Sequence, residues 1–240
     1  MKLFNFSNIR LILMFALVIV LFSFTSKRNN DRKLTKSVVV FVGDNAPFVD
    51  QETVNKLLIE NSKDAKNIGK DKLDLNKLEK RLNEQEMIEK SDVFVSIDGV
   101  LKAVVKQKTP IARVFDGENS FYIDYEGNTM SLSANFTARV PLVSGEINKK
   151  NSKELAELFR IIYDDAFLKK NIIGVQIMPN GSLKMLNRNY DYQIDFGGTV
   201  RMKAKFNNYK ALFQKAVLDS SLYKYKTIDL RFAQQVVCTK

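Results

Sequence analysis

The sequence predicts an α+β protein with an N-terminal transmembrane helix, a small β-α-α-β-β unit and a mainly antiparallel β domain with two helices. Residues 11–24 form an apolar run without a charge, which is typical of a membrane anchor. Beyond it, β-branched and leucine-spaced runs follow in the order strand, helix, helix, hairpin. Short apolar runs between glycines fill the C-terminal half. The predicted segments are a tail (1–8), the transmembrane helix (9–26), a linker (27–36), the β-α-α-β-β unit (37–109) and the β domain (110–240).

The composition of the 240-residue chain removes most catalytic and metal-binding chemistry. It contains no His, which excludes an imidazole base and any zinc or haem site with a His ligand. The single cysteine, Cys238, cannot form an internal disulfide and is too few for a thiolate cluster. Carboxylate, lysine or hydroxyl chemistry remains, or no chemistry at all. We expect no catalytic residue, no metal site, no cofactor and no small-molecule substrate.

The net charge of +11 is spread along the chain, which has 38 Lys+Arg and 27 Asp+Glu. Basic residues are interleaved with acids, as in Lys63-Asp64. No basic stripe with interleaved aromatic residues and no nucleic-acid-binding motif occurs in the sequence. We interpret the charge as a solvated surface and expect no nucleic-acid partner.

The N-terminal apolar segment predicts a partner of another kind, the lipid bilayer. With its flanking uncharged residues it covers residues 9–26, about 18 residues, which is the low end for a spanning helix. The run ends in Ser23-Phe24-Thr25-Ser26 and lacks a small-residue cleavage site. The pattern therefore favours an uncut single-pass anchor over a cleaved signal. A buried core helix is disfavoured because the run is apolar on all sides.

The charges that flank this anchor do not settle its orientation. Lys2 and Arg10 lie on the N-terminal side of its apolar run 11–24, whereas five basic residues follow the anchor: Lys27, Arg28, Arg32, Lys33 and Lys36. The positive-inside bias alone places the C-terminal bulk in the cytoplasm. Long domains, however, translocate largely regardless of charge, so export is also compatible with the sequence.

The β-α-α-β-β unit begins with the strand 37–42, a β-branched run that ends at turn residues. Asp50 is placed to cap the first helix, with Val49 and Val54 as a hydrophobic staple around it. Asp74 is placed to cap the second helix, whose leucines recur at helical spacing. Two further strands form a hairpin around Asp98-Gly99.

The register of that hairpin is a difficulty. A two-residue turn at Asp98-Gly99 sets Ile97 opposite Val100, and the apolar faces of the two strands then do not match. We expect a β-bulge to correct this.

The β domain begins at Pro110, since the residue before a proline favours extended or turn backbone. Ser152 is placed to cap a helix with apolar residues along one face. Residues 179–181 (PNG) predict a hairpin with a three-residue loop. A second helix is predicted over 201–218, and a closing strand over 227–237.

Catalytic patterns are weak. Asp164-Asp165 is the one adjacent acid pair of interest, but neighbouring residues on a helix point apart, so a solvated helix end is the better interpretation. Gly181-Ser182 lacks the flanking pattern of a nucleophile elbow. Neither glycine-rich nucleotide motif occurs in the sequence. We therefore expect a protein that is not an enzyme.

Several short motifs, taken in order, resemble those of the FtsQ/DivIB family of bacterial cell-division proteins, and the β-α-α-β-β unit resembles a POTRA domain. The motifs are Val42-Gly43, 73–78 (LDLNKL), 98–101 (DGVL), 105–114 (VKQKTPIARV), 121–127 (FYIDYEG) and 228–232 (IDLRF). The resemblance implies a non-enzymatic single-pass protein of the inner membrane with a cytoplasmic N-terminus and periplasmic domains. It further implies a position at the division septum, where such a protein binds FtsB- and FtsL-like partners and links early to late division proteins.

The resemblance also implies a partner-binding segment at the C-terminus. The closing strand, as the last element, is expected at a sheet edge, where unpaired backbone groups accept a partner strand. The tyrosine of the family's D-L-R-Y motif corresponds to Phe232. The predicted partner-binding residues are Phe232, Ala233, Gln234, Gln235, Val236 and Val237. The alternative is that Phe232 only packs inward with Ile228 and Leu230, because a half-buried strand buries one face.

Two other functions also fit the sequence. The first is a membrane-anchored cell-wall enzyme of carboxylate or lysine type, which a pocket with two carboxylates held together would favour. The second is a POTRA-type polypeptide-handling factor. A shallow surface with an open sheet edge would favour the division protein instead.

Overall fold

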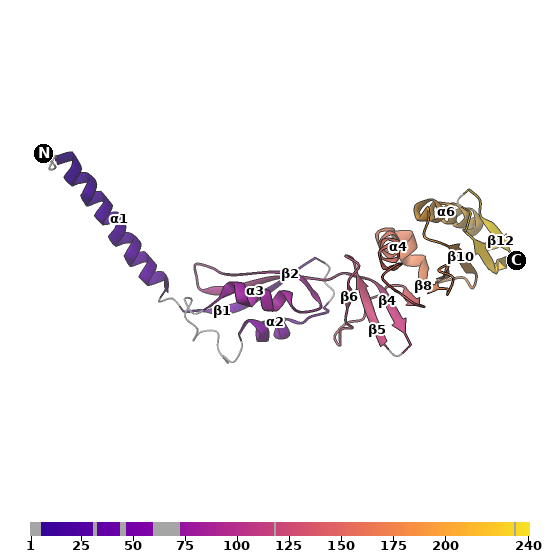
Figure 1. Cartoon of the computed structure of the whole chain (residues 1–240), viewed down its shortest axis with the longest axis horizontal. Helices are drawn as coiled ribbons and strands as arrows, with labels where there is room; N and C mark the ends of the chain where they lie inside the picture. Colours follow the sequence, from indigo (N-terminus) through magenta and orange to yellow (C-terminus); the bar gives the residue numbers. More distant parts are fainter. Residues whose placement is uncertain (1–5, 31–32, 44–46, 60–72, 118, 233) are drawn as a thin grey trace. The chain divides into compact units, whose positions relative to one another are not determined.

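The computed structural model of the chain describes residues 6–30, 33–43, 47–59, 73–117, 119–232 and 234–240. The chain divides into two compact units. Unit 1 comprises residues 1–45 and 49–107, and unit 2 comprises residues 46–48 and 108–240. Figure 1 colours the units in chain order, from indigo through magenta to yellow.

Unit 1 begins with a single long apolar helix, α1 (Phe6–Asn30). The stretch Asn8–Arg28 has a mean hydropathy of 2.4 and none of it is buried in the protein. Its 25 residues correspond to roughly 37 Å of helix, against about 30 Å for the hydrocarbon core of a bilayer. The predicted N-terminal helix is therefore present, and it is long and apolar enough to cross a membrane.

The rest of unit 1 has the predicted β-α-α-β-β order. Its strands are β1 (Lys36–Val42), β2 (Ile88–Val95) and β3 (Val100–Gln107), and its helices are α2 (Gln51–Leu58) and α3 (Leu75–Asn83). In the sheet β3 lies in the middle, parallel to β1 and antiparallel to β2. The two helices bury leucines and valines against one face of this sheet, which forms the core of the unit.

Both predicted helix caps of unit 1 are confirmed. The carboxylate of Asp50 accepts the backbone N–H of Thr53 at 2.7 Å, and that of Asp74 accepts the N–H of Lys77 at 3.0 Å. Each bond satisfies one of the N–H groups that a helix leaves unpaired at its start. Val49 and Val54 are both buried beside the first cap, as a hydrophobic staple requires.

The predicted two-residue turn of the β2–β3 hairpin is wrong. Val95 pairs with Leu101, so the loop contains the three residues 97–99. Gly99 closes it with a φ of +77°, the left-handed conformation that favours glycine. The extra residue brings the apolar faces of the two strands into register. A three-residue loop that ends in a left-handed glycine is the usual form of a G1 bulge, so the expected bulge lies in the turn itself. A further register shift lies between Ile88 and Lys90, at the start of β2.

Unit 2 is built on a sheet that has nine strands among the described residues, in the order β12-β11-β10-β9-β8-β7-β4-β5-β6. The strands are β4 (Pro110–Asp116), β5 (Asn119–Asp124), β6 (Thr129–Met130), β7 (Leu142–Ser144), β8 (Ile172–Ile177), β9 (Leu183–Asn187), β10 (Gln193–Gly197), β11 (Thr227–Asp229) and β12 (Val237–Thr239). Neighbours are parallel only in the pairs β4–β7, β7–β8 and β10–β11. The α+β class is confirmed, with a mainly antiparallel sheet.

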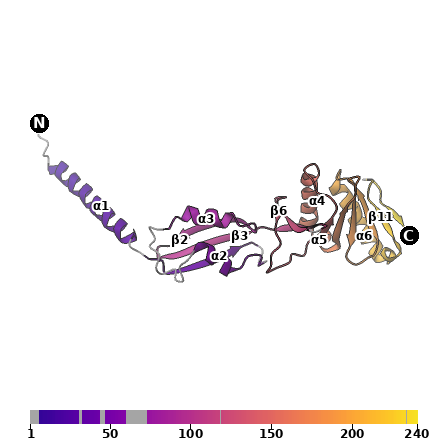
Figure 2. The ribbon, with the colours of Figure 1, turned by 60° about the horizontal axis from the view of Figure 1, so that its bottom comes forward.

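Helices cover one face of this sheet (Figure 2). They are α4 (Ser152–Asp164), α5 (Ala166–Asn171) and α6 (Met202–Leu218), followed by the 3₁₀ helix η3 (Ser221–Lys224). Phe159 of α4 and Phe206 and Tyr209 of α6 are buried against the strands. The hydroxyl of Tyr209 forms a hydrogen bond of 2.8 Å with that of Tyr192 and accepts another from Asn187, so the buried phenols are satisfied.

The helices of unit 2 differ from the prediction in two ways. The short helix α5 was not expected; it forms because Asp165 accepts the N–H groups of Phe167 and Leu168, both at 3.0 Å. Ser152 is not the cap of α4, which begins after Asn151. The predicted hairpin loop at 179–181 is confirmed, since Ile177 pairs with Leu183 across it.

Two glycines of unit 2 test how closely this backbone is packed. Gly145 and Gly181 both have positive φ, of +99° and +78°. A Cβ on Gly145 would lie 2.3 Å from the backbone oxygen of Ile177, whereas one on Gly181 would meet nothing within 4 Å. Gly181→Ala should cost about 1–2 kcal/mol of unfolding free energy from backbone strain alone. Gly145→Ala should cost about 1–3 kcal/mol more, because the backbone must move.

Denaturant unfolding of the full-length variants in detergent measures this difference. Equal losses of unfolding free energy for Gly145→Ala and Gly181→Ala would show that the backbone of Gly145 is not packed tightly against Ile177 of β8.

Candidate functional site

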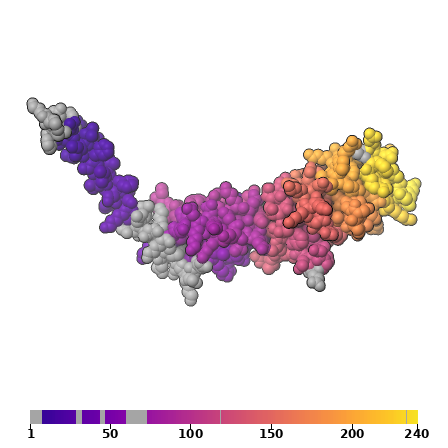
Figure 3. All heavy atoms as spheres, viewed as in Figure 1, coloured from indigo at the N-terminus to yellow at the C-terminus, as the bar shows by residue number. Residues whose placement is uncertain are grey.

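The candidate site lies at the C-terminal edge of the unit 2 sheet. β12 pairs with β11 on one side, and within the described residues no strand pairs with its other side. This segment lies on the molecular surface (yellow in Figure 3). The opposite edge of the same sheet is β6. An edge strand exposes backbone N–H and C=O groups that another strand can take up.

The predicted closing strand over 227–237 is wrong, because it is broken into two antiparallel strands. β11 ends at Asp229 and β12 begins at Val237. The break follows from the Asp229 side chain, whose Oδ1 accepts the backbone N–H of Arg231 at 2.9 Å. A bond of this kind, from a carboxylate to the N–H two residues on, turns the chain in place of a ladder bond.

The predicted partner-binding residues are divided by this break. Phe232, Gln234 and Gln235 lie in the connection between β11 and β12. Val236 precedes β12 and Val237 is its first residue. Ala233 lies outside the described residues. Among the members of the set that the structure describes, Val237 alone is on the edge strand itself, and partner binding by these residues stays a prediction.

The alternative in which Phe232 packs inward is wrong. Ile228 and Leu230 are fully buried in the core, whereas Phe232 is 51% exposed. The turn after Asp229 removes Phe232 from the alternating strand pattern. Its ring lies 6.0 Å from the guanidinium carbon of Arg231, at the limit of a cation–π contact.

Arg231 is fixed beside this turn by a two-point ion pair. Its Nε lies 3.0 Å from Oδ1 of Asp229, and its Nη2 lies 2.6 Å from Oδ2. The hydrogen bond from Arg231 is the main cause that lowers the pKa of Asp229 below its ordinary value of 3.8, while partial burial opposes it. Gly197 of β10 makes room for this arginine: a Cβ there would lie 2.8 Å from Cγ of Arg231.

A hollow of about 610 Å³ opens next to the turn. Three of its lining residues are cations and none is an acid. The lining residues are Val200, Arg201, Lys205, Arg231, Phe232, Gln234 and Gln235. Asp229, which pairs with Arg231, balances one of these charges, and the net positive charge that remains favours an acidic group on whatever enters the hollow.

Lys205 forms the inner wall of the hollow. It is only 5% exposed, and its Nζ donates to the carbonyl oxygens of Phe196 at 2.9 Å and Gly198 at 2.8 Å. Burial lowers the pKa of Lys205, and the charge of Asp229 acts in the opposite direction. Its bonds join the end of β10 to α6 at one side of the hollow.

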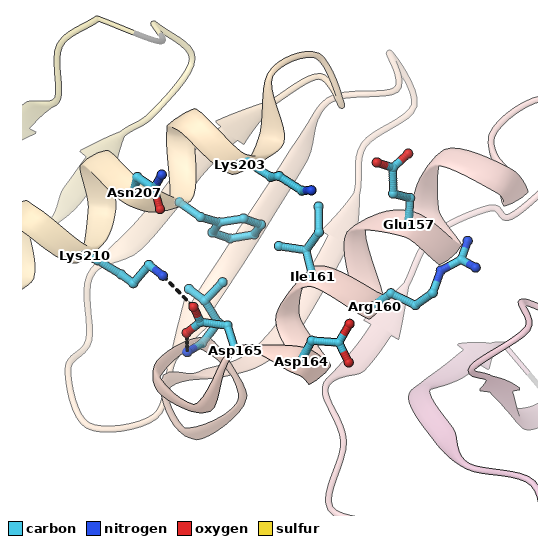
Figure 4. A pocket seen from close by; sticks show the side chains of 10 residues that line it. Glu157, Arg160, Ile161, Asp164, Asp165, Lys203, Asn207 and Lys210 are labelled. Carbon is cyan, nitrogen blue, oxygen red and sulfur yellow. Dashed lines mark hydrogen bonds and ion pairs between the residues drawn. The ribbon is translucent and has the colours of Figure 1, made fainter.

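A second hollow, of about 530 Å³, lies between α4–α5 and α6 and contains the Asp164-Asp165 pair (Figure 4). The two side chains point in different directions and have separate partners. Asp164 accepts the hydroxyl of Tyr125 at 3.0 Å, and Asp165 forms an ion pair with Lys210. Partial burial acts to raise the pKa of Asp165, but bonds from Lys210 and from the backbone lower it below its ordinary value. The two carboxylates are therefore not held together.

Metal-binding geometry is also missing from the part of the chain that is described, where no three His, Cys, Asp or Glu residues group together. The basic hollow could not be predicted from the sequence. Arg201 and Lys205 are far from Arg231 along the chain, and only the tertiary fold brings the start of α6 and the turn after β11 to the same hollow.

Comparison with known proteins finds a family that matches unit 2. A family model described as FtsQ/DivIB, C-terminal related, matches residues 109–239. A similar solved structure is the major extracytoplasmic domain of the trans isomer of the cell division protein DivIB from Geobacillus stearothermophilus. It is 14% identical, the match covers 47% of this chain and 95% of that one, and the TM-score is 0.32. No curated protein matches the chain.

The Asp229 pair predicts a pH dependence. A carboxylate whose folded pKa is lowered contributes stability that is complete above its unfolded pKa, here 3.8, and lost as the pH falls through the folded value. The difference in unfolding free energy between wild type and Asp229→Asn should therefore be largest at neutral pH and shrink below pH about 4.

Urea unfolding of the full-length proteins in detergent, from pH 7 to pH 3, measures this difference. Asp116→Asn, at an exposed position that ends β4, is the control. A difference that stays constant down to pH 3 would contradict the role of the Asp229 charge.

Proposed function

The chain belongs to the FtsQ/DivIB family, and on this premise we propose that it is a non-enzymatic cell-division protein that assembles other division proteins at the septum. The family match covers residues 109–239, more than half of the chain. The family is one of division proteins without enzymatic activity. The finer role, its partners and its binding residues are proposals that rest on the geometry of unit 2.

The proposed arrangement is that of a single-pass protein of the inner membrane. α1 provides the bilayer-spanning segment, supported by its length and hydropathy. Its N-terminus lies in the cytoplasm, whereas the β-α-α-β-β part of unit 1 and the whole of unit 2 lie in the periplasm, where they meet FtsB- and FtsL-like partners. This orientation follows the family and runs against the charge bias of the anchor.

The observation that supports partner binding best is the open edge of β12 next to the basic hollow. A partner segment in extended conformation adds to β12 and gains backbone hydrogen bonds, while its alternate side chains give specificity. An acidic residue of that segment enters the hollow beside Arg231, and an apolar one contacts the half-exposed ring of Phe232.

The alternative function, a cell-wall enzyme of carboxylate type, receives less support. It needs two carboxylates that act together on one substrate. In the second hollow Asp165 is neutralised by Lys210 and caps α5, and Asp164 is bound to Tyr125. These contacts give both residues structural roles.

A charge placed on β12 tests the docking proposal. Val237→Glu puts a carboxylate on the edge strand next to a site proposed for an acidic segment. It should weaken binding of the FtsB-like partner at least about tenfold, or about 1.4 kcal/mol. The fold should tolerate the change because Val237 is already 44% exposed. The affinity is measured by titrating full-length protein in detergent with the FtsB-like protein of the same cells.

Thr129→Glu is the matched control, since Thr129 is an exposed residue on β6, the other edge of the same sheet. It should bind as the wild type does. Normal binding by Val237→Glu, or equal losses in both variants with unchanged thermal stability, would show that β12 is not the docking edge.

A further inference from the structure

We propose that unit 1 pairs with a second copy of itself through the free edge of β1, so that two three-stranded sheets join into one. This interaction surface is separate from β12 and does not depend on the function proposed for unit 2. The inference comes from the difference between the two edges of the unit 1 sheet and from the sequence of β1.

β1 is an edge strand without the usual protection. It has seven residues and pairs with β3 on one side; within the described residues no other strand pairs with it. Its sequence is KSVVVFV, which has no charge after Lys36 and no proline. Natural edge strands are normally guarded by charges, prolines, bulges or short length, and an exposed, long, apolar edge favours pairing with another strand.

The opposite edge of the same sheet, β2, is protected against strand pairing by charged side chains. β2 carries Glu89, Lys90 and Asp92 among its exposed residues. The backbone N–H of Ser91 is already used, since it donates to Oδ1 of Asn83 at 2.7 Å. The two edges of one small sheet thus differ in charge and in the use of their backbone groups, and only β1 has the properties of a pairing edge.

The outer face of β1 adds apolar area to the open backbone. Val39 is buried beneath the helices, whereas Val40 and Val42 on the opposite face are each 43% exposed and Val38 is half-buried. A strand added to β1 would cover part of these valines as well as the backbone. Burial of these valines and new backbone hydrogen bonds would therefore both favour the addition of a strand.

A second copy of β1 fits this edge because the strand is self-complementary. Full antiparallel overlap of residues 36–42 places Val39 at the centre, and pairs Lys36 with Val42 and Val38 with Val40 of the other copy. No like charges oppose one another, and valines meet valines on the open face. α1 also confines copies to one bilayer, which raises their local concentration.

Cysteine cross-linking in membranes tests the register directly. In a Cys238→Ser background, which contains no other cysteine, one tagged full-length copy carries Val38→Cys and a second carries Val40→Cys. Directly opposed residues of an antiparallel pair have Cα atoms about 4.5–5.5 Å apart, which lies within the disulfide range of about 4.4–6.8 Å. We expect a heterodimer on a non-reducing gel, at least fivefold above either cysteine variant paired with itself. The self-pairs are diagonal, about 7–8 Å apart, and poorly placed for a disulfide.

The control repeats the experiment on the guarded edge, with Asp92→Cys in one copy and Phe94→Cys in the other. These residues have the same spacing on β2 and are also exposed, so they report collisions in the membrane. Three results would overturn the proposal: no excess over this control, equal cross-linking in the Val38→Cys self-pair, or an adduct of the β1 cysteines to a different protein. Val237→Glu should leave the β1 cross-link unchanged, which separates this proposal from the docking of a partner at β12.

Discussion

Backbone groups at the edge of a β-sheet must form hydrogen bonds, either with water or with another strand, and this constraint organises both units. Unit 2 ends its sheet in β12, and unit 1 ends its sheet in β1. Neither edge is closed by a partner strand within the described residues. The helices cover only one face of each sheet, so they bury the cores and leave the edges open. The surfaces that we assign to binding are therefore consequences of how each sheet ends.

A single side chain determines the shape of the unit 2 edge. Asp229 turns the chain by accepting the N–H of Arg231, and it binds the guanidinium of the same residue. The turn directs Phe232 towards solvent and allows β12 to fold back along β11. Two residues support this arrangement. Lys205 of α6 binds the carbonyl oxygen of Phe196 at the end of β10, and Gly197 of β10 leaves space for the side chain of Arg231. The edge and the basic hollow are thus parts of one structure.

Local signals in the sequence predicted most of the fold, and long-range contacts account for the failures. The caps Asp50 and Asp74 depend on residues three positions away, so their patterns were sufficient. The closing strand was predicted as continuous because apolar residues alternate with the others over 228–233. The carboxylate of Asp229 instead competes with the strand ladder, and alternation alone does not reveal this. The basic hollow needs the start of α6 and the turn after β11 to line one space, and no local sequence pattern predicts this.

The central claim, a role in cell division, is tested most directly by following the protein in dividing cells. A fluorescent fusion to the full chain should gather at the septum, and depletion of the protein should block division and give filaments. Recruitment to the septum together with filamentation would agree with the family and with an assembly role for the unit 2 edge. A uniform signal along the envelope, with normal division after depletion, would contradict the account.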